Sequence, residues 1–262
     1  MVQQWCRFQA EGKARFGRIE GEEVLTLDAA PWENGAETGT RQPLAAVKLL
    51  VPVIPPTFYC VGLNYREHVL DSARRKGTEP KFPQRPEVNY RSSSALTAHG
   101  DPIIKPREAG EQFQYEGELV VVIGKAGRYI PREHALEHVF GFSIGTDVSE
   151  RGWQRADRTN WRAKNTDTFN PMGPWIVSGA DYRAMETIVR LNGAEVDRFN
   201  TGAMIHDVED YIAEVSRYCT LHPGDVFWMG TDGAPRNMVP GDVCEVEITG
   251  IGVLRNPVLA ED

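Results

Sequence analysis

The sequence predicts a β-rich α+β protein. Its 262 residues include 25 Gly and 17 Pro spread along the chain, which is typical of a fold with many turns. Short apolar, β-branched runs such as Leu119 to Ile123 end at glycine, as buried strands do. A helical pattern covers Asp207 to Tyr218, where an acidic first turn suits the helix dipole.

Composition excludes several classes of protein. The net charge of −8 argues against nucleic-acid binding, which needs a basic surface. No apolar run approaches the ~18 residues of a membrane span, and no charged-then-apolar leader opens the chain, so we expect no membrane association. Four scattered cysteines lack metal-ligand spacing and indicate reduced core thiols in a cytoplasmic protein. They are Cys6, Cys60, Cys219 and Cys244.

The first part of the chain is predicted to form a small β domain, residues 1–54, followed by a larger domain, residues 55–262. Lys13 to Leu27 contains two alternating runs around a Glu-Gly-Glu turn and predicts a hairpin. Ala30 to Gln42 is polar and rich in turn residues, which indicates a surface loop. Val51 to Thr57 holds three prolines and reads as an extended linker.

Phe58 to Asp71 predicts a strand, a glycine turn and a helix. Asn64 suits the N-cap position, and Glu67 stands where a capping box places its acid. The helix puts His68 and Asp71 three residues apart on one face. A histidine beside a carboxylate is a general base with its orienting group, but an incidental pair on a surface helix fits this stretch equally.

The middle of the chain alternates loops and short strands. Lys76 to Glu87 is charged and proline-punctuated, and we expect it to form the outer part of a lid. Val88 to Ile104 predicts short strands around a Ser-rich turn. Arg132 to Val139 follows a proline and predicts a helix. Gly141 to Thr146 predicts a strand that places Asp147 at its end.

The following segments carry more polar groups. Val148 to Gln154 predicts a tight, partly helical loop, and Trp161 to Asn170 is a polar segment that carries Lys164. Pro171 to Pro174 reads as a rigid turn. Thr187 to Phe199, with Asn-Gly at its centre, predicts a hairpin.

Two Pro-Gly-Asp turns launch the last β-rich runs. These runs cover Val226 to Met229 and Val243 to Thr249. Between them, Gly230 to Gly233 forms a glycine loop. Such a loop either presents backbone N–H groups and a hydroxyl to an anion or serves as an ordinary hairpin loop.

The stretch from Tyr115 to Gly124 carries the candidate metal site. Side chains alternate along a strand, so Glu116 and Glu118 are expected to point the same way. Two such carboxylates repel each other unless a positive charge lies between them, and Mg²⁺ prefers carboxylate oxygens and water. The alternative is a strand end whose glutamates are only solvated.

Several motifs together resemble the fumarylacetoacetate hydrolase family, over residues ~55 to ~258. Each motif alone is weak, but six or more in the family's order and spacing are specific. The matching segments are Cys60 to Tyr65 with His68; Tyr115 to Leu119; Thr146 to Ser149 with Arg151 and Gln154; Lys164 with Asp167 to Phe169; Met172 to Trp175; Gly230-Thr231; and Pro240 to Asp242.

This resemblance implies a fold, a cofactor and an assembly. The fold is a mixed β-sandwich roll, and the assembly is a homodimer. The family's metal ligands match Glu116, Glu118 and Asp147. An all-carboxylate site suits Mg²⁺, or Mn²⁺ as the alternative ion.

The resemblance also implies roles for six other residues. His68 matches the family's histidine on the lid helix, with Asp71 as its acidic partner and Lys164 as a further catalytic residue. Arg151, Gln154 and Thr231 match positions that face the substrate.

The chain departs from the family pattern at four places, of which the first concerns the partner of His68 and the other three concern substrate selection. Asp71 is one methylene shorter than the glutamate that small members carry. Gly152 replaces an acid, and the loop usually read as Thr-Gly-Thr-Pro is Met229 to Asp232. A segment that often ends in lysine here ends in Arg91.

The implied activity is hydrolysis of a carbon–carbon bond in an acylpyruvate or related 1,3-diketo acid, as in the breakdown of aromatic compounds. His68 would activate water, and the metal would stabilise an enolate leaving group. Decarboxylation of oxaloacetate-type 2-oxo acids and isomerisation of 2-hydroxy-diene-dioates use the same site without an attacking water. A catalytically silent metal-binding protein is the alternative outside enzymes.

Overall fold

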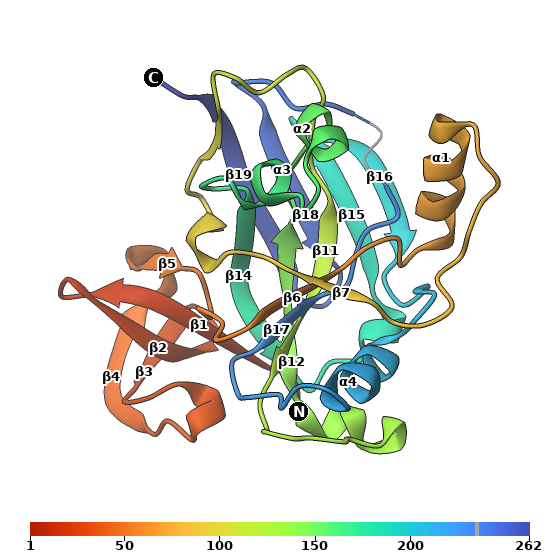
Figure 1. Cartoon of the computed structure of the whole chain (residues 1–262). Coiled ribbons are helices and arrows are strands. Elements are labelled where there is room, and N and C mark those ends of the chain that lie inside the picture. Colours follow the sequence, from red (N-terminus) through yellow and green to blue (C-terminus); the bar gives the residue numbers. More distant parts are fainter. Residues whose placement is uncertain (234–235) are drawn as a thin grey trace.

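A computed structural model describes residues 1–233 and 236–262, and its core consists of two stacked β-sheets (Figure 1). The large sheet comprises β1 (Gln3–Ala10), β2 (Lys13–Glu20), β3 (Glu23–Leu27), β4 (Glu37–Pro43), β5 (Lys48–Leu50), β6 (Phe58–Val61), β7 (Val88–Tyr90), β8 (Leu96–Ala98), β11 (Gly117–Ile123), β12 (Val139–Thr146), β14 (Asn170–Ser178) and β17 (Val226–Trp228). The smaller sheet comprises β9 (Ile103–Lys105), β15 (Glu186–Leu191), β16 (Ala194–Asn200), β18 (Val243–Ile248) and β19 (Gly252–Ala260).

The remaining elements cover the edges of these sheets. A short pair joins β10 (Phe113–Gln114) to β13 (Ser149–Glu150). The α-helices are α1 (Arg66–Lys76), α2 (Arg151–Ala156), α3 (Trp161–Asn165) and α4 (Val208–Ser216). The 3₁₀ helices are η1 (Pro31–Glu33), η2 (Leu44–Ala46), η3 (Ser93–Ala95), η4 (Arg132–His138) and η5 (Tyr182–Ala184). Among the described residues, no helix is both long and apolar enough to span a bilayer.

The large sheet is mixed, as the predicted sandwich roll requires. Its strand order is β4-β3-β2-β1-β14-β12-β11-β17-β6-β7, with β5 beside β1 and β8 beside β14. Most neighbours run antiparallel, whereas β17–β6 and β14–β8 are parallel. The β-rich α+β class is therefore confirmed.

Strand β11 lies at the centre of the core, and all seven of its residues are buried. Leu119, Val121 and Ile123 join the cluster that includes the smaller sheet. Val120 and Val122 face the opposite side, in a cluster with Trp228. Because both faces are covered by apolar side chains, the strand is continuously hydrophobic instead of alternating. This packing fixes the register of the strand end that carries the two glutamates.

The N-terminal strands extend the large sheet instead of standing apart from it. Strand β1 pairs antiparallel with β14, with Gln3 opposite Ser178 and Trp5 opposite Ile176. A separate small core of Cys6, Phe8, Ile19 and Val24 lies under this part of the sheet. The domain boundary between residues 54 and 55 stays a prediction.

Two local predictions were wrong. The segment predicted as a surface loop, Ala30 to Gln42, contains η1 and most of β4, because β4 pairs with β3 at the sheet edge. The predicted turn Pro171 to Pro174 lies inside β14, where the pairing with β12 is irregular and tolerates prolines without N–H donors. The helix predicted at Arg132 to Val139 is present, as the 3₁₀ helix η4 that follows Pro131.

The helix at Asp207 has the predicted cap. The Asp207 side chain accepts from the Asp210 N–H, and the Asp210 side chain accepts from the Asp207 N–H, a complete capping box. Asn64 does not cap α1, whose N-cap is Tyr65 without a side-chain bond. Instead, the buried Asn64 amide donates to the carbonyls of Met229 and His206, at 3.0 and 3.1 Å. The Asn64 side chain therefore bonds to carbonyls that lie far away in the sequence instead of capping the helix that follows it.

We predict that Gly145→Ala destabilises the fold by about 1–3 kcal/mol, the usual cost of overpacking. A Cβ at residue 145 would lie 2.7 Å from the buried Trp228 ring, and Gly145 pairs with Glu118 in the β11–β12 ladder. Urea denaturation measures the change. Gly233→Ala is the control, because a Cβ there meets no atom of the described residues within 4 Å. Equal stability of the two variants would contradict this packing argument.

Candidate metal centre

Three buried carboxylates meet at one end of the β11–β12 pair. In this ladder Gly117 lies opposite Thr146, so Asp147 follows directly beside Glu116, and its N–H donates to the Glu116 carbonyl at 2.8 Å. Carboxylate oxygens of Glu116, Glu118 and Asp147 lie within 4.8 Å of one another. Each residue is at most 5% exposed. The expected shared orientation of the two glutamates is therefore present, and the solvated strand end is excluded.

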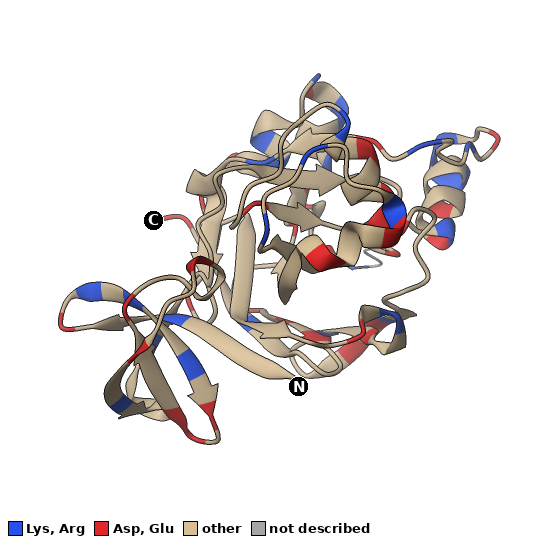
Figure 2. Cartoon of the chain, turned by 90° about the horizontal axis from the view of Figure 1, so that it is seen from below, with Lys and Arg blue, Asp and Glu red and all other residues tan. Residues whose placement is uncertain are grey.

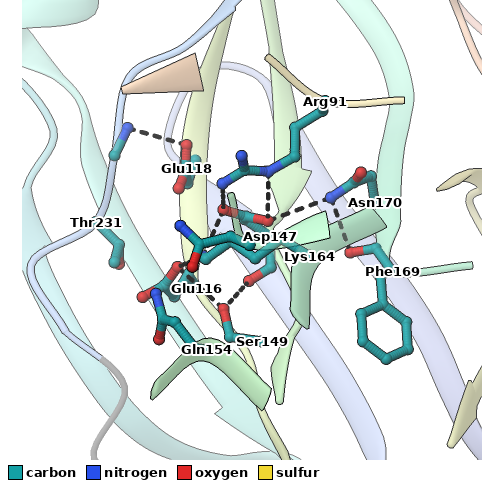
Figure 3. Close-up of polar contacts among 12 residues, drawn as sticks. Arg91, Glu116, Glu118, Asp147, Ser149, Gln154, Lys164, Phe169, Asn170 and Thr231 are labelled. Atoms are coloured by element: carbon teal, nitrogen blue, oxygen red, sulfur yellow. Dashed lines mark hydrogen bonds and ion pairs between the residues drawn. The ribbon is translucent and has the colours of Figure 1, made fainter. Parts of the chain in front are cut away.

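Lys164 and Arg91 are two of the three cationic side chains that contact these carboxylates (Figure 3). Lys164, on α3, donates from Nζ to Glu116 and, at 2.7 Å, to Asp147. Arg91 follows β7 and donates to both Asp147 oxygens, at 2.8 and 3.3 Å. Asn170, at the start of β14, donates to Asp147 at 3.2 Å. Asp147 is thus held by three side chains from three different elements.

These cations decide which carboxylates are ionised. Burial opposes ionisation of Glu116, but Arg151 and Lys164 outweigh it and hold its pKa well below the usual range. Asp147 is likewise disfavoured by burial, while Arg91 and Lys164 lower its pKa. Both carboxylates therefore carry charge at neutral pH.

Glu118 is in the opposite situation. Burial, followed by the charges of Asp147 and Glu116, raises its pKa well above the usual range. Its Oε2 accepts a bond of 2.9 Å from the Gly230 N–H. Among the described residues, no Lys or Arg forms an ion pair with Glu118. The triad thus lacks one positive charge on the Glu118 side.

The donor set fits a hard divalent cation. Three carboxylates on paired strands provide oxygen ligands within a small volume, and Mg²⁺ and Mn²⁺ both accept such ligands with water completing the shell. A divalent ion would also supply the charge that keeps Glu118 ionised. Glu116, Glu118 and Asp147 are therefore the residues that would hold the metal.

Arg151 contacts the triad from its other side. Its guanidinium donates to Glu116 at 2.7 Å, to Gln154 at 2.9 Å and to Gln114 at 2.8 Å. Arg151 is the first residue of α2, and the side chain of the buried Glu150 caps the first turn of this helix. The structure thus brings Arg151 and Gln154 together, and it directs Arg151 to a metal-site carboxylate.

A small cavity opens beside these groups. Its volume is about 120 Å³, and its walls include His68, Arg91, Lys164, Gln154 and Thr231. Of the nine residues assigned a role from the sequence, seven line this cavity, and an eighth, Asp147, is buried behind Lys164. The Thr231 hydroxyl donates to the Gly233 carbonyl at 3.2 Å. In this state the Gly230 loop therefore directs an N–H to Glu118, and its anion-binding role stays a prediction.

Asp71 is the one predicted site residue that lies elsewhere. It is exposed and pairs with Arg74, one turn along α1, at 2.7 Å. His68 lines the cavity, and its buried Nδ1 has no hydrogen-bond partner among the described residues. The expected His68–Asp71 contact is thus not formed, because Arg74 offers Asp71 a solvent-exposed charge partner.

Burial sets the protonation state of His68. It lowers the pKa of the imidazole, and the charges of Arg151, Lys164 and Arg75 add to this effect against an opposing contribution from Glu116. His68 is therefore neutral at pH 7. A neutral imidazole without an acidic partner accepts a proton from a nearby acid and returns it.

Sequence reasoning assigned no role to Arg91 and Asn170. Arg91 was noticed as a departure from the family's lysine, but its contact with Asp147 depends on the pairing of β7 with β6. Asn170 follows Lys164 in a stretch that carries no pattern of its own. A buried polar residue at a strand start is the signal that would have indicated it, and burial is not visible in the sequence.

Together, the mixed sheets and the buried acidic triad beside a small cavity define a β-rich protein with a candidate divalent-metal site. The chain belongs to the fumarylacetoacetate hydrolase family. A family model described as fumarylacetoacetate (FAA) hydrolase C-terminal matches residues 57–259, and one described as Rv2993c-like, N-terminal, matches residues 4–52.

Solved structures share nearly the whole fold, and a curated relative matches most of the sequence. A 5-carboxymethyl-2-hydroxymuconate delta-isomerase from Mycobacterium smegmatis is 33% identical, with a TM-score of 0.89 over 98% of this chain and 100% of that chain. A 2-hydroxyhepta-2,4-diene-1,7-dioate isomerase from Mycobacterium marinum is 32% identical, with a TM-score of 0.86 over 99% of each chain. The oxaloacetate tautomerase YisK of Bacillus subtilis is 34% identical over 82% of this chain and 74% of its own.

We predict that Glu118→Gln lowers Mn²⁺ affinity by at least about 100-fold, the upper end of what losing an outer-shell partner costs. The substitution replaces a carboxylate oxygen with a neutral amide. Among the described residues this carboxylate pairs with no Lys or Arg, so no protein cation competes with the metal for it. Titration calorimetry with Mn²⁺ and with Mg²⁺ measures the effect. Glu247→Gln, a substitution in the surface pair with Arg190, is the control. Unchanged affinity in Glu118→Gln would contradict the assigned ligand set.

Proposed function

We propose that this protein catalyses metal-dependent proton transfer at the carbon next to the oxo group of a 2-oxo acid, that is, keto–enol tautomerisation or double-bond isomerisation. The observation that carries this proposal is the neutral, half-buried His68 on the wall of the metal-site cavity, whose buried Nδ1 lacks the acidic partner that water activation needs. The names of three relatives support it, since they are an oxaloacetate tautomerase and two isomerases.

The charges of the site match such a substrate. The three carboxylates Glu116, Glu118 and Asp147 share the site with three basic side chains that line the same cavity. These are Arg91, Arg151 and Lys164, and their ion pairs are with Glu116 and Asp147. When bound, a divalent ion supplies a Lewis acid that stabilises negative charge on an enolate oxygen. The site then has two positive charges in excess, which suits a ligand with one carboxylate and one enolate.

The chain's own residues perform the proton transfer in this proposal. The His68 imidazole takes a proton from the carbon beside the oxo group and returns it to the enolate oxygen or to a carbon further along the conjugated chain. Arg91 and Lys164 orient the acidic end of the substrate by charge-assisted bonds. Gln154 and Thr231, on the same cavity wall, are positioned to contact the remaining polar atoms.

Hydrolysis of an acylpyruvate is the second candidate. Asp71 lies three residues from His68 on α1, so a rotation of the Asp71 side chain away from Arg74 would create the water-activating pair. Lys164 and Gln154 would then stabilise the oxyanion. Decarboxylation of an oxaloacetate-type acid needs the metal site without this pair.

Three further expectations belong to this proposal. We propose Mg²⁺ or Mn²⁺ as the ion, a homodimer as the assembly and the cytoplasm as the location. The described cysteines are all free thiols, and Cys6, Cys60 and Cys244 are buried, which suits a reducing compartment.

We predict that His68→Ala lowers the tautomerisation rate by about 10²–10⁴-fold, the usual contribution of a positioned acid–base group, whereas Asp71→Asn changes it less than about threefold. The assay follows the ultraviolet absorbance of enol-oxaloacetate with saturating Mn²⁺. Acylpyruvate cleavage is followed in parallel through loss of the diketone absorbance.

The variants separate the candidates. Acylpyruvate cleavage that falls in both variants would establish the hydrolase and overturn the tautomerase. Full tautomerisation by His68→Ala would exclude His68 as the proton carrier. No turnover of any 2-oxo acid, with Mn²⁺ still bound, would favour a metal-binding protein without catalysis.

The pKa of His68 predicts the acid limb of the pH profile. Because the folded-state pKa lies below the ordinary 6.5, His68 stays neutral as the pH falls through 6.5 and is protonated only below it. The kcat/KM profile should therefore stay level down to pH 6.5 and decline at lower pH. An inflection above pH 6.5 that disappears in His68→Ala would contradict the burial argument.

A further inference from the structure

The carboxylate of Asp147 accepts two hydrogen bonds from one arginine. The Arg91 guanidinium donates from Nη2 to Oδ2 at 2.8 Å and from Nε to Oδ1 at 3.3 Å, so it spans both oxygens (Figure 3). Lys164 and Asn170 each donate to one of these oxygens, at 2.7 and 3.2 Å. An ionised carboxylate has about four acceptor positions. A guanidinium that spans both oxygens occupies the two positions on the edge between them, which are the positions that a metal ion chelated by both oxygens needs.

Backbone and side-chain contacts fix the position of the Arg91 guanidinium. The side chain is 6% exposed, and its Nη1 donates to the Tyr90 carbonyl at 3.3 Å. The Arg91 N–H donates to the Phe58 carbonyl at 3.1 Å, which continues the pairing of β7 with β6. A planar guanidinium is also pre-organised for a carboxylate, so little freedom is lost when the two bonds form. The pairing of Arg91 with Asp147 is therefore built into the edge of the large sheet.

The other two carboxylates of the triad are held differently. Arg151 donates to Glu116 through Nη2 alone, at 2.7 Å, and its other nitrogens bond elsewhere. Glu118 accepts from the Gly230 N–H. Among the residues that the structure describes, neither glutamate contacts two nitrogens of one guanidinium. Within the triad, only Asp147 has its chelating edge covered by an arginine.

The number of oxygens that a carboxylate offers distinguishes one divalent ion from another. Ca²⁺ takes about six to eight oxygen ligands and often binds both oxygens of a carboxylate, whereas Mg²⁺ keeps a compact octahedron with several waters. Mn²⁺ accepts the same octahedral set of oxygens. A carboxylate that offers one oxygen therefore suits Mg²⁺ and Mn²⁺ better than Ca²⁺.

Net charge does not distinguish these ions, because all of them are divalent. The chain's charge of −8 attracts each of them. Figure 2 shows Lys and Arg segments mixed with Asp and Glu segments along the chain. Selectivity among the three ions must therefore come from the local geometry of the ligands.

We propose that Arg91 is a positioning residue that limits Asp147 to one metal-bound oxygen, so that the centre selects Mg²⁺ or Mn²⁺ over Ca²⁺. This inference rests on the proposed function, because it requires a divalent ion at the triad. By covering the chelating edge of Asp147, Arg91 also leaves coordination positions of the ion to water and to the oxo acid. A lysine in its place donates from a single nitrogen and leaves part of that edge free.

The test measures the ratio of Mn²⁺ to Ca²⁺ affinity by titration calorimetry in the wild-type protein, in Arg91→Lys and in Arg151→Lys. A ratio is used because a change in charge or in stability acts on two divalent ions alike. Arg91→Lys keeps the charge and loses the two-pronged contact. We expect it to lower the ratio by about tenfold, the lower end of what an outer-shell partner contributes. Its ratio of Mn²⁺ to Mg²⁺ affinity should stay within about twofold, since both ions accept an octahedral set of oxygens.

Arg151→Lys is the matched control, because it makes the same substitution beside Glu116, which receives one guanidinium nitrogen. Its Mn²⁺ to Ca²⁺ ratio should stay within about twofold of the wild-type value, below the range of outer-shell effects. An unchanged ratio in Arg91→Lys, or an equal fall in both variants, would overturn the inference and leave the proposed function standing. Tighter binding of Ca²⁺ than of Mn²⁺ by the wild-type protein would overturn it too, and this measurement needs no variant to fold. Failure of the wild-type protein to bind any of the three ions would overturn the proposed function itself.

Discussion

The crowding of three carboxylates in a dry site is the constraint on which the rest of this structure depends. Glu116, Glu118 and Asp147 are nearly inaccessible to water, and the energy of two like charges rises steeply as the surrounding dielectric falls. Such a group is stable only with positive charge beside it. Lys164 and Arg91 supply part of that charge. Glu118 pairs with no Lys or Arg among the described residues, so it marks the position where a divalent ion would complete the charge.

The large sheet explains how so many polar groups reach one place. Strand β11 is buried on both faces, so its register is fixed by the core and cannot slip by one residue without exposing the whole apolar set. The ends of neighbouring strands lie beside the same end of β11. Asp147 directly follows the last residue of β12, and Asn170 is the first residue of β14. The helices α2 and α3 follow this edge directly and contribute Arg151 and Lys164. The site is therefore a consequence of strand order, built from segments that lie far apart in sequence.

The sequence predicted the parts of this arrangement that are local. Strand alternation was enough to place Glu116 and Glu118 on one side, and the hairpin of β15 and β16 followed from Asn-Gly between two apolar runs. It did not predict outcomes that depend on competing partners. Asn64 had the residue type of a cap but donates to carbonyls across the fold, and Asp71 had the spacing for His68 but pairs with Arg74. The role of Arg91 needed the β6–β7 pairing, which no short motif encodes.

The absence of an Asp71 contact at His68 bears directly on the chemistry. Hydrolysis needs a base that holds and deprotonates water, and an acidic partner both orients the imidazole and stabilises it once it is protonated. Proton transfer on an enolisable acid needs no acidic partner, because the substrate itself becomes negative as the imidazole becomes positive. The two charges then lie next to each other in a site of low dielectric, and their attraction replaces that of the missing aspartate. A neutral, half-buried histidine beside this carboxylate site is therefore better matched to enolisation than to water attack.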